Sequence, residues 1–119
     1  MIDDCLPSTH PIDATCRDNE EAQGLLDGIA YGKGAVFLNQ IINSIGETTF
    51  FNGCKAYFEK FGWQNTELKD FIGCLSDSLN SDQGEKPEFD LMEFADLWLN
   101  HSGCNSVVSK FEISSEGYI

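Results

Sequence analysis

Positively charged residues are scarce in this 119-residue chain. Lys and Arg together number 7, whereas Asp and Glu number 20, so the formal net charge is −13. A protein that binds a nucleic-acid backbone or an anionic membrane surface needs a basic face. We therefore expect no nucleic-acid partner and no membrane partner, and we interpret the acidity as that of a solvated surface.

Long apolar runs are also lacking. No stretch approaches the roughly 18 consecutive apolar residues that read as a transmembrane helix. The first residues, Met1-Ile2-Asp3-Asp4, are acidic and do not resemble a signal peptide, provided that Met1 is the native start.

Paired cysteines are the third absence. The five cysteines are an odd number, and no two of them form a C-x-x-C motif, which argues against a disulfide framework or a structural zinc site. We expect buried free thiols in a reducing compartment, and hence a cytoplasmic protein. The cysteines are Cys5, Cys16, Cys54, Cys74 and Cys104.

Motifs that mark a catalytic centre are missing as well. The sequence has no H-E-x-x-H, no G-x-S-x-G, and no phosphate-loop frame around Gly32-Lys33-Gly34. His10 precedes a proline in a loop, and His101 stands at a helix end, where it complements the helix dipole. The acidic clusters stand at helix starts or in loops. We therefore assign no metal ligand and no cofactor-binding residue.

Helical periodicity is what the sequence does contain. After an irregular lead-in over residues 1–18, the apolar spacing predicts an all-α bundle of about five helices, with no internal repeat. Asn19 is the expected cap of the first helix, Asn65 or Thr66 that of the fourth, and Asp90 that of the fifth. The predicted helices cover residues 19–26, about 29–45, 47–61, about 66–79 and about 90–100.

The second predicted helix is apolar almost all round, which is typical of a buried helix. On one face, spacing aligns Tyr31, Ala35, Leu38, Ile42 and Ile45. After the last helix, Val107 to Ile113 alternates weakly and could begin a strand, whose partner would lie outside the chain unless the segment is a loose tail. The apolar surface is generous for five short helices, which hints at a larger domain.

Tyr31 has two interpretations. Residue chemistry alone favours a phenol packed in the core. A phenol at a rigid, glycine-bordered helix start can instead donate a hydrogen bond to an oxygen that gains charge in a reaction, which contributes roughly 3 kcal/mol to a transition state.

Five segments in order resemble the M1-family zinc aminopeptidases of the aminopeptidase N type, over about residues 8–111. The pattern I-G-E-x-x-F-x-x-G-x-x-x-Y-F runs from Ile45 to Phe58. The other segments are S-T-H-P-I at 8–12, D-G-I-A-Y-G-K-G-A at 27–35, W-Q-N-T at 63–66, and W-L followed by G-C-N at 98–105. Each motif alone is weak, but five in the right order form a strong resemblance.

The resemblance implies a fold and a role. Residues 1–105 would be the C-terminal, helical half of a thermolysin-like catalytic domain, and residues 106–119 the start of a following β-sandwich domain or a tail. Tyr31 would match the catalytic tyrosine that stabilises the oxyanion while the zinc enzyme hydrolyses N-terminal residues from peptides.

The chain departs from the family in one respect. The zinc motif and the G-x-M-E-N segment, which in the family precede the segment matched by Ser8, are absent. We expect a fragment that lacks the N-terminal half of the domain, binds no zinc and is inactive alone. The alternative is a non-catalytic helical interaction module, a degenerate paralogue that binds a peptide or protein partner. The coding DNA upstream of Met1 discriminates the two.

Overall fold

The computed structural model describes residues 3–84, 86–111, 113–114 and 117–118, and this part of the chain is mainly helical. The predicted all-α fold is confirmed. In chain order the elements are η1 (Asp3–Cys5), α1 (Asn19–Gly24), α2 (Gly28–Ile45), α3 (Glu47–Phe61), α4 (Leu68–Ser81), α5 (Leu91–Leu99), β1 (Ile113–Ser114) and β2 (Gly117–Tyr118).

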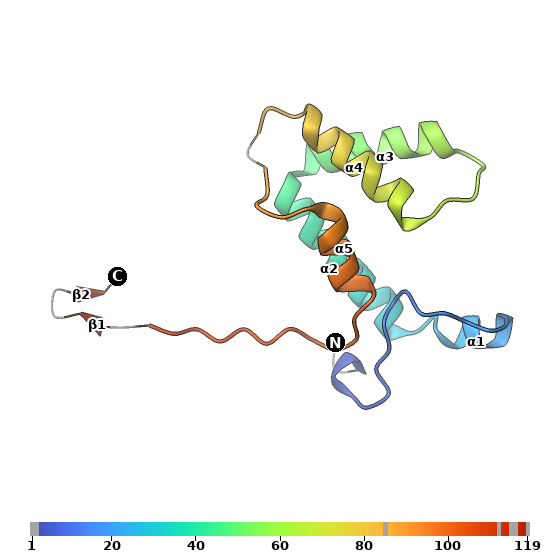
Figure 1. Ribbon diagram of the computed structural model, residues 1–119, viewed down its shortest axis with the longest axis horizontal. Coiled ribbons are helices and arrows are strands. Elements are labelled where there is room, and N and C mark those ends of the chain that lie inside the picture. The colour runs from blue at the N-terminus through green and yellow to red at the C-terminus, as the bar shows by residue number, and fades with distance from the viewer. Residues whose placement is uncertain (1–2, 85, 112, 115–116, 119) are drawn as a thin grey trace.

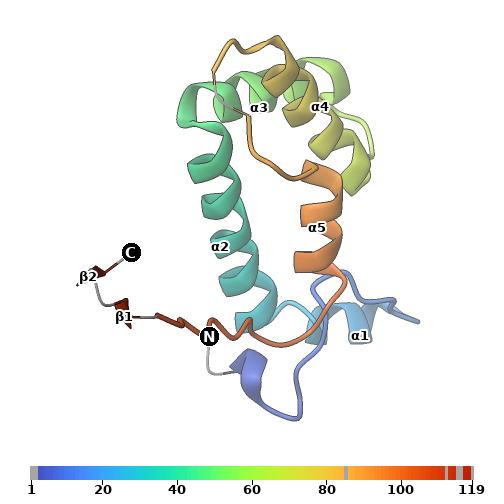
Figure 2. The same cartoon turned by 60° about the vertical axis from the view of Figure 1, so that its left-hand side comes forward.

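Helix α2 is the axis of the molecule. One of its ends leads into the hairpin formed by α3 and α4, while α5 returns alongside α2 in the opposite direction (Figures 1 and 2). Helix α1 and the N-terminal segment lie at the other end of α2. None of the helices among the described residues is both long enough and apolar enough to cross a bilayer.

Aspartates begin three of the helices. The Asp27 carboxylate accepts the backbone N–H groups of Ile29 and Ala30 at 2.8 and 3.0 Å, and Asp90 caps α5 in the same way, as predicted. Such caps satisfy N–H groups that have no partner within the helix.

Two predicted caps are wrong. Helix α1 is capped by Asp18, whose extended backbone brings its carboxylate to the N–H of Glu21, and not by Asn19. Helix α4 begins after Glu67, which forms a reciprocal capping box with Asp70, and not after Asn65 or Thr66. The box satisfies two backbone donors, the N–H groups of Glu67 and Asp70.

The core joins α2 to the three helices that follow it. On α2, Phe37 packs against Phe94 and Trp98 of α5, with ring centroids 5.9 and 6.4 Å apart. Gly53 lets α3 approach α4, because a Cβ there would lie 2.7 Å from a methyl carbon of Leu75. The buried cluster is Phe37, Ile41, Ile45, Phe50, Ile72, Leu75, Leu91, Ala95 and Leu99.

The face of α2 that packs is not the one on which spacing aligns apolar residues. Of the five residues aligned from spacing, only Ile45 is buried, and Tyr31 is 69% exposed. Because α2 is apolar nearly all round, periodicity could not select the face that packs. The face that does pack carries a lysine, and it consists of Ile29, Lys33, Phe37, Ile41 and Ile45.

The cysteines are less buried than predicted. Cys74 is buried and Cys54 is half-buried, but Cys5, Cys16 and Cys104 are exposed. The exposed three stand outside the α-helices, where no apolar helix face covers them.

The chain is more extended than a packed domain of its size. Its radius of gyration is 17.9 Å, against roughly 13.5 Å for a compact domain of this length. Residues 104–111 form no helix or strand and lead away from the helices (Figure 1). The strand predicted from Val107 begins only at β1, and its partner is β2 of the same chain, paired antiparallel. The weak alternation of apolar residues in the sequence runs only from Val107 to Ile113. It stops before β2, so it could not reveal this partner.

Candidate functional site

Tyr31 lies in the first turn of α2. Its backbone N–H donates to the carbonyl oxygen of Asp27 at 3.1 Å, and its side chain is 69% exposed. The interpretation of this phenol as a core residue is therefore wrong. The phenol stands on a regular helix with its side chain accessible to another molecule.

A histidine supports the cap of that helix. His10 Nε2 lies 3.1 Å from the Asp27 carboxylate, and its Nδ1 lies 2.8 Å from the carbonyl oxygen of Pro11. Both ring nitrogens thus face acceptors, which suits the doubly protonated ring. The hydrogen bond to Pro11 and then the one to Asp27 raise the pKa of His10, while those from Ala30 and His10 lower the pKa of Asp27.

Two residues after Tyr31, Lys33 is buried and fully engaged. Its ammonium lies 3.2 Å from the Asp4 carboxylate and donates to the carbonyl oxygens of His101 and Gly103 at 2.7 and 3.2 Å. Both side chains of the ion pair are at most 5% exposed. A buried charge needs such compensation, because its removal from water is costly.

Asp4 completes this polar cluster. Its carboxylate accepts hydrogen bonds from the hydroxyl of Thr9 at 2.6 Å and from the backbone N–H of Gly103 at 3.0 Å. Burial alone would raise the pKa of Asp4, but these hydrogen bonds and Lys33 outweigh burial and lower it. The cluster fastens the N-terminal segment, α2 and the segment after α5 to one another.

Sequence reasoning missed this cluster. A phosphate loop at Lys33 was excluded from the sequence, but no acceptor for its ammonium was predicted. The sequence did contain a signal for this cluster. Lys33 lies four residues after Ile29 and four before Phe37, so it shares a helix face that is otherwise apolar. A lysine in such a place requires an acceptor from elsewhere in the chain.

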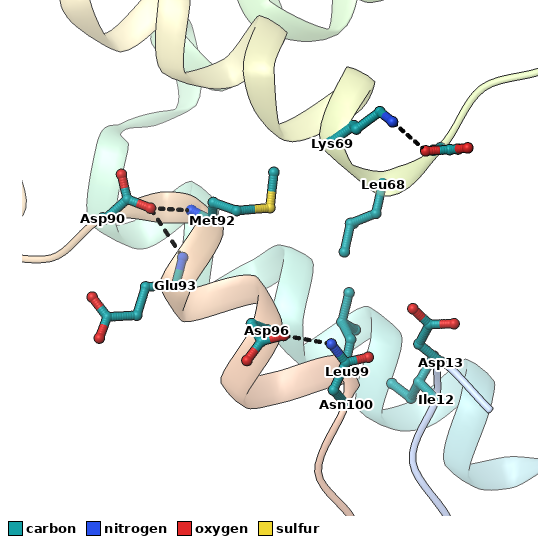
Figure 3. Close-up of a pocket in the computed structure, with 11 residues that line it drawn as sticks. Ile12, Asp13, Leu68, Lys69, Asp90, Met92, Glu93, Asp96, Leu99 and Asn100 are labelled. Carbon is teal, nitrogen blue, oxygen red and sulfur yellow. Dashed lines mark hydrogen bonds and ion pairs between the residues drawn. The ribbon is translucent and has the colours of Figure 1, made fainter. Parts of the chain in front are cut away.

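A cavity of about 870 Å³ lies between α5, the start of α4 and the segment at Ile12. Figure 3 shows carboxylates around an apolar floor that includes Leu68 and Leu99. The one lysine that lines it, Lys69, is paired with Glu67 at 2.6 Å. Tyr31, the residue singled out from the sequence, does not line this cavity.

A smaller cavity of about 470 Å³ lies beside Lys33. Its walls include Phe94, Leu97 and Trp98 of α5, and Cys104 from the segment after that helix. His101 also lines it and is exposed. The role of the His101 ring toward the helix dipole stays a prediction.

The described side chains form no site that fits a zinc ion. Within the described ranges, no three His, Cys, Asp or Glu side chains gather in a way that could hold a metal. His10 instead binds the cap of α2, and the sequence contains no H-E-x-x-H.

Comparisons with known proteins give a family match. The model of the peptidase family M1 domain matches residues 1–101. Aminopeptidase N of Streptomyces lividans is 36% identical over 116 residues, covering 98% of this chain and 13% of the relative. Glutamyl aminopeptidase of Bos taurus is 34% identical over 101 residues, or 85% of this chain and 10% of the relative.

A third relative also aligns with much of the chain. The probable aminopeptidase 1 of Saccharolobus solfataricus is 39% identical over 85 residues, which are 71% of this chain and 11% of the relative. The chain thus spans about a tenth of the length of these curated relatives. Since the family model covers most of the sequence and relatives above 30% identity align along it, this chain belongs to peptidase family M1.

Proposed function

We propose that this chain is the helical part of the catalytic domain of a zinc aminopeptidase that removes N-terminal residues from peptides. Residues 1–105 would belong to that domain and residues 106–119 would lead into the next one. The N-terminal half of such a domain, which the given sequence does not include, would be its structural partner, and the cytoplasm its compartment. The observation that carries the proposal is the exposed phenol of Tyr31 on the capped first turn of α2.

In this proposal Tyr31 is the oxyanion donor. As the scissile carbonyl oxygen gains negative charge, the phenol hydroxyl donates a hydrogen bond to it, and the bond strengthens in the transition state. A fixed donor is more effective than a mobile one, because no reorganisation is needed during the reaction. No set of side chains among the described residues could hold the zinc ion of the family. The hydrogen bond from the phenol of Tyr31 is therefore the one catalytic role that we assign to these residues.

The backbone of Tyr31 is fastened on both sides. Asp27 holds the start of the turn through the N–H groups of Ile29 and Ala30. Lys33 holds its far side through the Asp4 carboxylate and two backbone carbonyls. These contacts resist translation and rotation of the first turn, and so they fix the point from which the phenol projects.

The isolated chain is expected to bind no zinc and to hydrolyse no aminoacyl reporter. Metal analysis after dialysis and a reporter assay on the purified chain test this. Stoichiometric zinc, or hydrolysis that follows the chain through purification, would contradict it.

The role of Tyr31 is tested in a chimaera. The matching segment of Streptomyces lividans aminopeptidase N is replaced by this chain, and kcat and KM are measured for an aminoacyl reporter. We expect Tyr31→Phe to lower kcat by roughly two orders of magnitude with little change in KM.

Tyr57→Phe is the matched control. It removes the same atom from a phenol whose oxygen lies 2.5 Å from the Thr66 hydroxyl, at the α3–α4 hairpin. We expect this variant to retain kcat. An active chimaera whose kcat is the same with Phe at position 31 would remove Tyr31 from the mechanism.

A further inference from the structure

Two thiols that are 99 positions apart in the sequence meet at the end of the molecule opposite the hairpin. The Sγ atoms of Cys5 and Cys104 lie 3.1 Å apart, and both residues are exposed. A disulfide bond has an S–S length of about 2.05 Å. The two sulfur atoms are therefore about 1 Å from bonding distance, which a small side-chain rotation can close.

The buried ion pair keeps these thiols together. Asp4 immediately precedes Cys5, and Gly103 immediately precedes Cys104. The Asp4 carboxylate accepts the N–H of Gly103 at 3.0 Å, and Lys33 binds both Asp4 and the carbonyl oxygen of Gly103. The contact between the thiols therefore lies directly beside a fixed hydrogen-bond network, and not between two loose loops.

We propose that Cys5 and Cys104 form a reversible oxidation site, at which a disulfide fastens the N-terminal segment to the segment after α5. The oxidant is a low-molecular-weight disulfide. The thiolate of one cysteine attacks it and releases one small thiol, and the thiolate of the other cysteine then displaces the second small thiol. The two cysteines lose two electrons and two protons, and the small disulfide gains them.

The surroundings of Cys104 admit such an oxidant. Cys104 lines the cavity of about 470 Å³ beside Leu97 and Trp98, so a small molecule can approach the sulfur. The hydrogen bond shared with Cys5, together with some loss of hydration and the nearby charge of Asp4, raises the pKa of the Cys104 thiol. Because the thiolate is the attacking form, the disulfide should form faster as the pH rises above neutral.

The test uses the full chain and glutathione disulfide. After incubation of the folded protein, thiols are counted, the intact mass is measured, and a peptide map is recorded without reduction. We expect the loss of two thiols, a mass decrease of about 2 Da, a cross-linked peptide containing Cys5 and Cys104, and reversal by dithiothreitol. The oxidised chain should also unfold at a higher temperature, since the cross-link constrains the unfolded state.

Variants sharpen the assignment. Cys5→Ser and Cys104→Ser should each prevent the internal cross-link and leave a glutathione adduct on the remaining thiol. The matched control Cys16→Ser removes another exposed thiol and should leave the cross-link intact. The peptide map of the unaltered chain decides the assignment even if a variant folds poorly.

Three outcomes would overturn the proposal. They are a cross-link made through Cys16, stable glutathione adducts on both Cys5 and Cys104, and retention of both thiols in a chain that circular dichroism shows to be folded. A rate of cross-linking that does not increase between pH 7 and pH 9 would overturn the proposed thiolate steps.

Discussion

The two ends of this molecule are stabilised in different ways. At one end, α3 and α4 form a hairpin whose apolar side chains come from neighbouring stretches of sequence, and Gly53 brings the two helices into close contact. At the other end, the start of α2 is held by polar groups. Lys33 binds carbonyls 68 and 70 positions away, and Gly103 binds Asp4 across 99 positions.

This difference affects how each end responds to substitution. The apolar hairpin distributes its stability over many contacts, each of them small. The polar end depends on a few groups, and a partner left alone there is a buried, unsatisfied charge. The candidate tyrosine lies at the polar end, so its position depends on these few groups.

The largest effect is expected when the ion pair is broken. Lys33→Met keeps most of the apolar stem but leaves the Asp4 carboxylate buried without its cation. We expect a loss of about 3–5 kcal/mol in the free energy of unfolding, measured by urea denaturation.

Lys55→Met is the control for a lost lysine. Lys55 pairs with Glu59 at 3.9 Å on the exposed surface of α3, where an ion pair contributes little. We expect almost no change. If both variants lost the same free energy, the polar end would not depend on the buried pair.

A smaller effect is expected at the hairpin. In Gly53→Ala the new Cβ would lie 2.7 Å from Leu75 Cδ2 and 3.0 Å from Leu75 Cα, so the helices must separate. We expect a loss of about 1–3 kcal/mol, measured in the same way. Gly73→Ala on α4 meets no atom within 4 Å and should be neutral or stabilising, since Ala favours a helix. Equal losses in the two variants would contradict close packing at Gly53.

The smallest effect concerns pH. The pKa of His10 is raised by its contacts with Pro11 and Asp27, so the stabilisation is complete below the unfolded pKa near 6.5 and is lost as the pH rises through the raised value. The difference in stability between the wild-type chain and His10→Gln should therefore be largest near pH 6 and decline toward pH 9. Its size should be about 1 kcal/mol or less. A difference that is constant over this range would contradict the interaction with Asp27.

Much of the fold could be predicted from the sequence. Helical spacing and the glycine at position 46 placed α2 and α3 closely, because their boundaries are set by local chemistry. The caps at Asp18 and Glu67 were missed by one or two residues, since several polar residues compete at each helix start. The pairing of β1 with β2 was missed because the pattern was followed no further than Ile113.

The candidate site was less predictable. The family motif pointed to Tyr31, but its exposure depends on which face of α2 packs, and an all-round apolar helix does not reveal that. The ion pair between Lys33 and Asp4 joins two positions that no local sequence pattern connects. Likewise, spacing could not show that Cys5 and Cys104 meet, because their contact exists only after the polar end has assembled.

The carbonyl groups that receive Lys33 determine when this end can form during synthesis. Helices α3 and α4 can pair once residue 81 has left the ribosome, because all their mutual contacts are then available. The ammonium of Lys33 must wait for the carbonyl oxygen of Gly103, which follows α5, so it lacks this partner until α2 to α5 have been translated. The turn that carries the phenol is thus synthesised about 70 residues before the carbonyl group of Gly103 that helps to immobilise it.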